Sequence, residues 1–190
     1  MPESNFGVPE SNLESSGVKV NVEIKARSSN HDGIRRVLEG RGARFVGKDH
    51  QVDTYFNVSE GRLKLREGNI ENSLIFYKRS NQSGPKQSDV VLVRVQPDPA
   101  LRAVLSASNG VKVVVDKQRE IWFDGNVKFH LDQVEGLGSF VEIEAIDADG
   151  SKKSPALEKQ CRFYMDLFGI VEADLIDRSY SDLLIERPSD

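Results

Sequence analysis

The sequence has little cysteine and no long apolar segment. Cys161 is the only cysteine among 190 residues, so no disulfide can form within the chain. The sequence also holds neither an apolar signal segment nor an apolar run of membrane-spanning length. These absences predict an intracellular, cytoplasmic protein that has no membrane partner.

An excess of basic residues is missing as well. The chain carries 26 Lys and Arg residues against 30 Asp and Glu residues, which gives a formal net charge of -4. Proteins that bind nucleic acids or anionic membranes normally carry a basic excess, so this balance weighs against a nucleic-acid partner. Net charge says nothing about clustering, and a local basic site for a small anion remains compatible with it.

Several familiar catalytic motifs are also absent. The sequence has no phosphate-binding loop of the Gly-x-x-x-x-Gly-Lys type and no nucleophile elbow. His31, His50 and His130 do not have the spacing of metal ligands, and we interpret His130 as a barrel residue or a group that supports a ligand. Cys161 lies on an apolar helical stripe and is predicted to be a core residue.

The pattern of apolar residues predicts an α+β domain with a closed antiparallel barrel. Residues 1–16 are rich in Pro, Ser, Asn, Gly and Glu and are predicted to form a disordered tail, which leaves residues 17–187 as a single domain. Eight strands joined mostly by hairpin-length loops predict one antiparallel sheet, closed into a barrel and covered by helices. The predicted strands are 18–27, 44–56, 62–67, 74–79, 89–96, 111–123, 127–134 and 140–146, and the predicted helices are 31–40, 98–107, 154–168 and 180–186.

Charged residues recur with a period of two on these strands. Lys25 and Arg27 share a face of the first strand, and a later strand presents three cations in the same way. Acids recur at the same spacing on other strands. The remaining members of the pattern are the cations Arg62, Lys64, Arg66, Lys78, Arg94, Lys117, Arg119 and Lys128, and the acids Asp132, Glu142 and Glu144.

This pattern has two interpretations. The charged faces are either solvated surfaces with cross-strand pairs, or they converge in an enclosed tunnel lined with both signs. A tunnel of buried unpaired charge is costly unless a ligand occupies it. Clustered Lys and Arg suit a polyanion such as a phosphate, while clustered carboxylates suit a hard divalent cation. The tunnel interpretation therefore predicts a triphosphate and Mg²⁺ or Mn²⁺ as ligands.

The motifs, taken in order, resemble those of the CYTH superfamily, or triphosphate tunnel metalloenzymes. They cover about residues 18–185, and the closest resemblance is to the branch that resembles class IV adenylyl cyclases. Each motif is weak alone, and their order and number make the combination specific. They are Val22-Glu23-Ile24-Lys25, Gln51-x-Asp-Thr-Tyr-Phe, Gly61-Arg62-Leu-Lys-Leu-Arg-Glu67, Lys117-x-Arg119, Phe129-His-Leu-Asp132, Gly136-Leu-Gly138 with Glu142-x-Glu144, and Arg178-Ser-Tyr180.

The resemblance implies an eight-stranded tunnel and a role for each matching residue. Metal ligands would be Glu23, Glu142 and Glu144, with Asp132 beside them. Phosphate ligands would be Lys25, Arg62, Lys64, Arg66, Lys78, Lys117 and Arg119, and Arg178 could close one end. The charge pattern adds Arg27 and Arg94 to the phosphate ligands. Lys25 and Arg119 are the predicted catalytic cations, which would stabilise charge on the phosphates and the leaving group.

One residue departs from the family signature Glu-x-Glu-x-Lys, because Asn21 occupies the first Glu position. This change removes one anionic ligand and predicts either a more weakly held metal ion or a water molecule in place of the carboxylate. Two reactions fit the site, hydrolysis of an organic or inorganic triphosphate and cyclisation of ATP to cyclic AMP and pyrophosphate. Hydrolysis is favoured because it places fewer requirements on the site than cyclisation does. A polyphosphate or nucleotide binder without catalysis is the third hypothesis, and the oligomeric state stays open.

Overall fold

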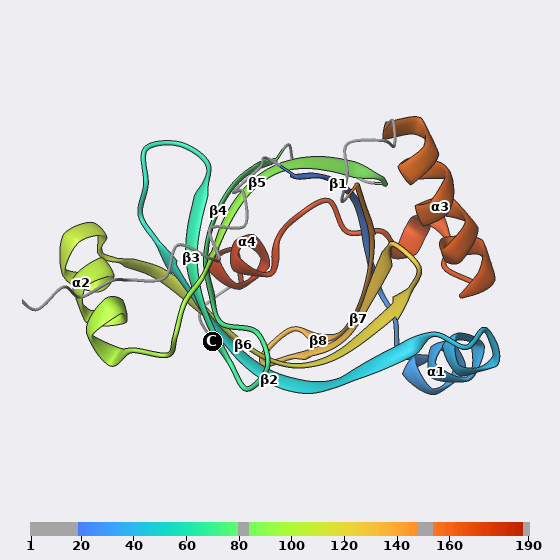
Figure 1. The fold of residues 1–190 in the computed structure, drawn as a ribbon. Coiled ribbons are helices and arrows are strands. Elements are labelled where there is room, and N and C mark those ends of the chain that lie inside the picture. Colours follow the sequence, from blue (N-terminus) through green and yellow to red (C-terminus); the bar gives the residue numbers. More distant parts are fainter. Residues whose placement is uncertain (1–18, 80–83, 148–153, 188–190) are drawn as a thin grey trace, which may run out of the picture.

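The computed structural model describes residues 19–79, 84–147 and 154–187 (Figure 1). The predicted tail, residues 1–16, lies outside the described residues. The strands are β1 (Lys19–Arg27), β2 (Arg44–Phe56), β3 (Arg62–Gly68), β4 (Ser73–Arg79), β5 (Lys86–Arg94), β6 (Val111–Asp124), β7 (Val127–Val134) and β8 (Gly138–Ile146).

The eight strands form one antiparallel sheet. Their order is β1-β5-β4-β3-β2-β6-β7-β8, and β1 also pairs with β8, so each strand has a hydrogen-bonded neighbour on both sides. Figure 1 looks into the resulting ring. The predicted α+β class and the eight antiparallel strands are confirmed. Because residues that pair across antiparallel strands share a face, the register fixes which side chains point into the ring.

The helices lie on both sides of this sheet. They are α1 (His31–Gly40), α2 (Pro99–Asn109), α3 (Ser154–Leu167) and α4 (Tyr180–Ile185), with a 3₁₀ turn, η1 (Glu172–Asp174). Figure 1 places α1 and α3 outside the ring beside β1, β7 and β8, whereas α4 lies within the ring. The side chain of Asn30 caps α1 by accepting a hydrogen bond from the backbone N–H of Gly33 (3.1 Å). None of the described helices has the length and apolar character needed to cross a membrane.

An outer apolar layer fills the space between the sheet and these two helices. We use this name for the buried cluster formed by Ile24, Phe129 and Ile143 of β1, β7 and β8 with Leu38 of α1 and Leu157 of α3. Each of these side chains is at most 1% exposed. Because successive strand residues point to opposite faces, this outward apolar set forces the alternate, polar residues of the same strands into the ring.

A second apolar cluster lies at the part of the ring that α4 occupies. Tyr180 of α4 packs against Phe140 of β8, with ring centroids 4.9 Å apart, and Val115 and Val134 belong to the same cluster. The inward face of β6 therefore changes character along its length, from Val113 and Val115 to Lys117 and Arg119. That face of β6 is therefore apolar where it meets α4 and charged further along the strand.

The start of β5 differs from the sequence-based prediction. The strand begins at Lys86, whereas the polar composition of residues 81–88 predicted a loop that ends at residue 88. The strand extends backwards because Lys86 to Val90 pair with Glu23 to Lys19 of β1. Backbone pairing with a distant strand therefore overrides local composition here.

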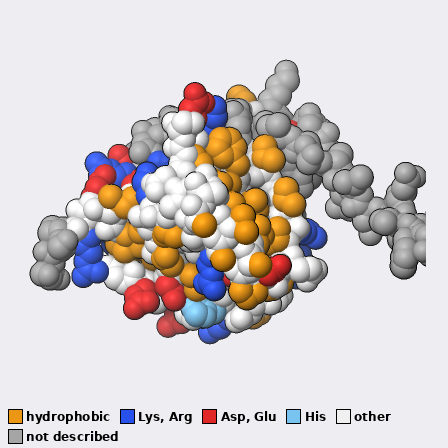
Figure 2. All heavy atoms as spheres, turned by 90° about the vertical axis from the view of Figure 1, so that its left-hand side faces the viewer, with side chains coloured by type: hydrophobic (Ala, Val, Ile, Leu, Met, Phe, Trp, Pro, Cys, Tyr) orange, Lys and Arg blue, Asp and Glu red, His pale blue; other side chains and the backbone are white. Residues whose placement is uncertain are grey.

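The face on which α2 lies exposes apolar side chains. Figure 2 views the molecule from that side and shows hydrophobic side chains gathered there. None of the α2 residues is fully buried. The exposed apolar side chains of β5, α2 and the start of β6 are Val91, Leu92, Val93, Val104, Val111 and Val114.

Candidate functional site

Three cations converge on one carboxylate inside the ring. Asp53 of β2 accepts hydrogen bonds from Lys64 Nζ (3.0 Å), Lys117 Nζ (2.7 Å), and Arg66 Nε and Nη2 (2.8 and 3.0 Å). The register explains the convergence, because Asp53 is the cross-strand partner of Arg66 on β3 and of Val115 on β6. Asp53 and Lys117 are 2% and 1% exposed, so water does little to screen their charges.

The pKa values of this cluster reflect a surplus of positive charge. Burial alone would raise the pKa of Asp53, but the charges of Arg66, Lys117 and Lys64 hold it well below its ordinary value. The pKa of Lys117 is lowered to about 7, because burial and the neighbouring cations outweigh the attraction of Asp53. Lys64, Arg66 and Lys117 share Asp53, and Arg66 has Glu71 as a second carboxylate partner. These three cations still outnumber their two carboxylate partners, so an additional anion would be stabilised here.

A second cluster is centred on Arg119 of β6. Its guanidinium donates to both oxygens of Asp132 (2.7 and 2.5 Å) and to Glu142 (2.8 Å). Glu142 also contacts Lys25 Nζ at 2.9 Å and His130 Nδ1 at 3.0 Å. Burial raises the pKa of Glu142, but Lys25 and Arg119 hold it well below its ordinary value, so the carboxylate stays charged.

The C-terminal helix takes part in this second cluster. Tyr180 of α4 donates a hydrogen bond from its hydroxyl to Asp132 (2.8 Å), and Lys25 Nζ lies 3.6 Å from the centroid of the Tyr180 ring. Arg62 of β3 donates to Asp182 of α4 (2.8 Å). Burial, together with the charge of Asp132, raises the pKa of the Tyr180 hydroxyl well above its ordinary value. The phenol is therefore a neutral hydrogen-bond donor at neutral pH.

The predicted metal ligands lie near the β1–β8 pairing. Glu23 and Glu144 are direct cross-strand partners, and Glu142 follows two residues away on the same face. Like charges placed opposite each other destabilise a sheet unless a cation lies between them. Asn21 Nδ2 donates to Glu144 (2.6 Å), while Asn21 Oδ1 is buried and lacks a hydrogen-bond partner. This set of oxygen donors fits a hard divalent cation such as Mg²⁺ or Mn²⁺.

The oxygen atoms of these carboxylates do not converge on a single point. Among the described residues, no group of three or more His, Cys, Asp or Glu side chains could hold a metal ion as they stand. Asp132 and Glu142 are instead occupied by Arg119, Lys25 and Tyr180. A metal ion could use Glu142 only if its cationic partners moved to another anion.

Four of the predicted phosphate ligands lie apart from these clusters. The position of Lys78 differs from the prediction. Ile75 and Tyr77 of β4 point into the ring, so the Lys78 side chain, which follows Tyr77, points outward. It is 55% exposed and pairs with Glu60 (2.5 Å). Arg27 is exposed and donates to the backbone oxygen of Leu137 (3.1 Å). The other two are also at the surface, Arg94 at the end of β5 and Arg178 paired with Glu186.

Sequence reasoning missed several interior residues. Asp53 was part of a quoted motif but received no role. Tyr180 was part of the quoted motif Arg178-Ser-Tyr180 and was predicted to begin a helix, but it received no role in the site. Glu71 lies in the turn between β3 and β4, contacts Lys128, Arg66 and Gln51, and offered no sequence signal at all.

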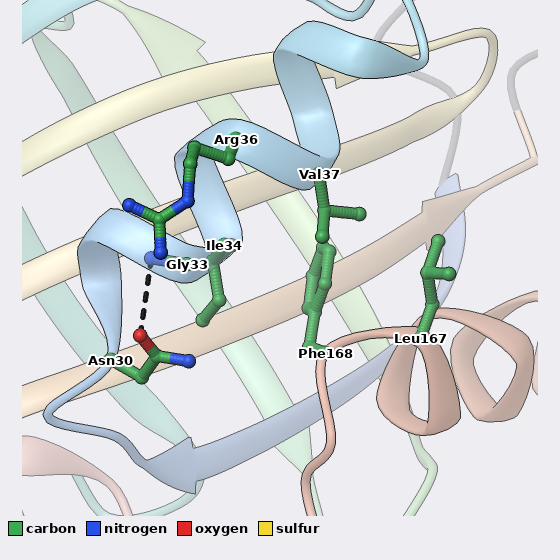
Figure 3. Close-up of a pocket in the computed structure, with 7 residues that line it drawn as sticks. All are labelled: Asn30, Gly33, Ile34, Arg36, Val37, Leu167 and Phe168. Carbon is green, nitrogen blue, oxygen red and sulfur yellow. Dashed lines mark hydrogen bonds between the residues drawn. The ribbon is translucent and has the colours of Figure 1, made fainter.

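A hollow also exists on the outside of the molecule, away from the charged interior. It has a volume of about 370 Å³ and lies between α1 and the end of α3 (Figure 3). Ile34, Val37, Leu167 and Phe168 line it together with the polar side chains of Asn30 and Arg36. It is separate from the two charged clusters inside the ring.

Comparisons with known proteins agree with this geometry. A family model described as CYTH domain matches residues 19–180. The chain is 27% identical over 179 residues to "Putative adenylate cyclase MJ0240" of Methanocaldococcus jannaschii, which covers 86% of this chain and 98% of that protein.

Solved structures share the architecture. The PH1012 protein from Pyrococcus horikoshii OT3 matches with a TM-score of 0.73 at 27% identity, over 86% of this chain and 98% of that one. HpAC1 from Hippeastrum, described as revealing a dominant triphosphatase activity, matches with a TM-score of 0.56 over 88% of this chain and 94% of that one. Its identity is 12%, so this second likeness concerns the fold alone.

Proposed function

The chain belongs to the CYTH domain family, and on this premise we propose that it is a divalent-metal-dependent enzyme that hydrolyses an organic or inorganic triphosphate. The observation that carries the proposal is the convergence of Lys64, Arg66 and Lys117 on the single carboxylate of Asp53. Buried cations in excess of their counter-ions favour a polyanion, and Arg binds phosphate oxygens through two parallel hydrogen bonds. A triphosphate supplies the charge that this cluster lacks.

Binding of the triphosphate would exchange the partners of the second cluster. Lys25 and Arg119 would transfer from Glu142 to phosphate oxygens, which leaves Glu142 free to join Glu23, Glu144 and Asn21 around a divalent cation. When bound, the ion supplies positive charge to the phosphate oxygens. The exchange couples the two ligands, so each should bind more tightly in the presence of the other.

In this proposal Lys25 and Arg119 are the catalytic residues. Both lie in an interior from which water is largely excluded, Lys25 being 4% and Arg119 3% exposed. Fixed cations in such a place stabilise the charge that develops on the leaving phosphate without reorganising. Tyr180, which contacts Lys25 and Asp132, would keep both of these groups in position.

Cyclisation of ATP is the second candidate, and the name of the relative MJ0240 favours it. Cyclisation requires that the ribose 3′-hydroxyl reach the α-phosphorus, so the site would also have to hold a nucleoside. Hydrolysis requires only water at the terminal phosphorus. A binder without catalysis is the third candidate, which the neutral side chain of Asn21 supports.

A product-resolved assay distinguishes these three candidates. The protein is incubated separately with tripolyphosphate, ATP and thiamine triphosphate, each with Mg²⁺ or Mn²⁺. Release of orthophosphate supports the proposed hydrolysis, and formation of cyclic AMP with pyrophosphate supports the second candidate. Tight binding without turnover would leave the third, and absence of both binding and turnover would refute the proposed function.

A further inference from the structure

Lys128 lies on the interior face of β7 but does not bind the acid opposite it. Its cross-strand partner on β8 is Glu144, yet its Nζ atom lies 2.5 Å from Oε1 of Glu71. Glu71 belongs to the turn between β3 and β4, which reaches across to β7. The contact therefore joins β7 to the turn between β3 and β4, although neither of these two strands is a neighbour of β7 in the sheet.

The same Glu71 carboxylate holds two further donors. Oε2 accepts from Arg66 Nη1 (3.0 Å) and from Gln51 Nε2 (3.1 Å). Lys128 and Arg66 are 13% and 10% exposed, and Glu71 is 26% exposed. Two cations and an amide donor around two oxygens form the kind of donor set that also binds a phosphate group.

The turn that carries Glu71 is firmly anchored. The fully buried carboxylate of Asp49 accepts hydrogen bonds from the backbone N–H groups of Ile70 (2.8 Å) and Glu71 (3.0 Å). The Asn72 side chain also exchanges two hydrogen bonds with the backbone of Gly68 (3.0 and 2.9 Å). The backbone at Glu71 is thereby fixed, so its carboxylate is held against Arg66 and Lys128.

Arg66 links this group of donors to the cluster around Asp53. Its Nε and Nη2 atoms bond Asp53, and its remaining Nη1 atom bonds Glu71. Anions that replaced the two carboxylates would therefore be neighbours across a single guanidinium. Adjacent phosphate groups of one linear polyphosphate chain meet this requirement.

We propose that Lys128 is a further phosphate-binding residue and that Glu71 is a built-in competitor for the same position. In the ligand-free protein, Glu71 neutralises Lys128 and Arg66. An outer phosphate of the triphosphate displaces the Glu71 side chain and takes over both cations. This inference rests on the proposed function, since it assigns where one end of that substrate binds.

Tripolyphosphate binding to the full chain tests the proposal, measured by isothermal titration calorimetry at low salt without metal ions. Glu71→Gln keeps the size of the side chain and removes its charge, so we expect a dissociation constant at least five-fold lower than in the wild type. Glu60→Gln is the matched control, because Glu60 also pairs with a lysine at 2.5 Å but lies on the outer surface. This control should bind as the wild type does.

Lys128→Gln tests the other half of the contact. In the Glu71→Gln background it should weaken tripolyphosphate binding at least ten-fold, and in the wild-type background it should weaken binding less, because Glu71 already offsets that charge. Unchanged or weaker binding by Glu71→Gln would overturn the competitor role, and unchanged binding by Lys128→Gln in both backgrounds would overturn the phosphate role.

The two levels of the proposal fail in different ways. If the wild type and Glu60→Gln bind tripolyphosphate but the Glu71 and Lys128 variants bind no differently, only this inference is refuted. If none of the proteins binds tripolyphosphate with or without Mg²⁺ or Mn²⁺, the proposed function is refuted and this inference with it. Should Glu71→Gln fail to fold, as judged by circular dichroism, wild-type affinity in Lys128→Gln alone would refute the inference.

Discussion

The outer apolar layer and the charged interior are built by the same strands and differ in almost every physical respect. On β8, Val141 and Ile143 face the outer layer, while Glu142 and Glu144 between and beside them face the ring. The outer layer is formed by buried apolar side chains from β1, β7, β8, α1 and α3. The interior holds buried ion pairs that involve six of the eight strands.

This contrast separates what stabilises the fold from what supports function. Apolar burial contributes about 25 cal/mol per Å² of surface removed from water, whereas buried ion pairs only roughly offset their own desolvation. A chain selected for stability alone would have little reason to fill its ring with Lys, Arg, Asp and Glu. The proposed triphosphate and metal ligands would account for this interior, and on that proposal substitutions in the two regions should respond differently to triphosphate.

The largest effect is expected from Asp53→Asn. This change leaves Lys64, Arg66 and Lys117 without their shared counter-ion, so the ligand-free protein should lose about 3–5 kcal/mol of unfolding free energy. Saturating tripolyphosphate should restore much of this loss. Urea denaturation with and without tripolyphosphate measures both quantities. A loss below about 1 kcal/mol would mean that the cations do not depend on Asp53.

A comparable loss without any rescue is expected in the outer layer. Ile143→Ala creates a cavity at a side chain that is fully buried, so we expect a loss of about 2–5 kcal/mol. Because Ile143 does not face the ring, tripolyphosphate should stabilise this variant by the same amount as the wild type. The same urea denaturation experiment measures the unfolding free energy of this variant with and without tripolyphosphate. Greater stabilisation by tripolyphosphate than in the wild type would contradict the distinction between the two regions.

A smaller effect is expected on the number of protons that the protein takes up when it binds tripolyphosphate. Since the pKa of Lys117 is lowered to about 7, most of its side chains are neutral at pH 8, and a bound polyanion would raise that pKa. Binding at pH 8 should therefore take up about one proton and should become tighter as the pH falls from 9 to 7. Calorimetry in buffers of different ionisation enthalpy measures the uptake. Lys117→Met should lack this component, and equal uptake by both proteins would contradict the assignment.

The smallest effect is expected at the surface. Lys78→Ala removes an exposed ion pair with Glu60, so stability should change by no more than about 0.5 kcal/mol. Tripolyphosphate affinity should stay the same, because the Lys78 side chain points away from the ring. A loss of affinity comparable to that of Lys64→Ala would show that Lys78 reaches the ligand after all.

The sequence predicted the strands well because alternation identifies both their position and their two faces. The period of two on β1 predicted that Lys25 opposes the side on which Ile24 is buried, and the same logic held for Lys64, Lys117 and Glu142. The outward orientation of Lys78 was not foreseen, because charge on the strand was counted without its parity. Its neighbours Ile75 and Tyr77 take the inward positions.

The rest of the candidate site depends on contacts between distant parts of the chain. Glu71 reaches Lys128 across the ring from a turn whose geometry Asp49 determines, and no local pattern encodes that reach. Tyr180 enters the interior because α4 lies within the ring, and the sequence of this six-residue helix does not indicate that position. The start of β5 could not be predicted from local sequence either, because it depends on pairing with β1.

The pairing of β1 with β8 also bears on how this chain folds. Asn21 and Glu144, which meet in that pairing, are 123 positions apart in the sequence. Contacts of such long range require a large loop to close before they yield any stabilisation, which makes folding slow, on the order of milliseconds to seconds. Until the ring closes, Lys25 and Glu142 remain hydrated, so dehydration of these charges coincides with the joining of the first strand to the last.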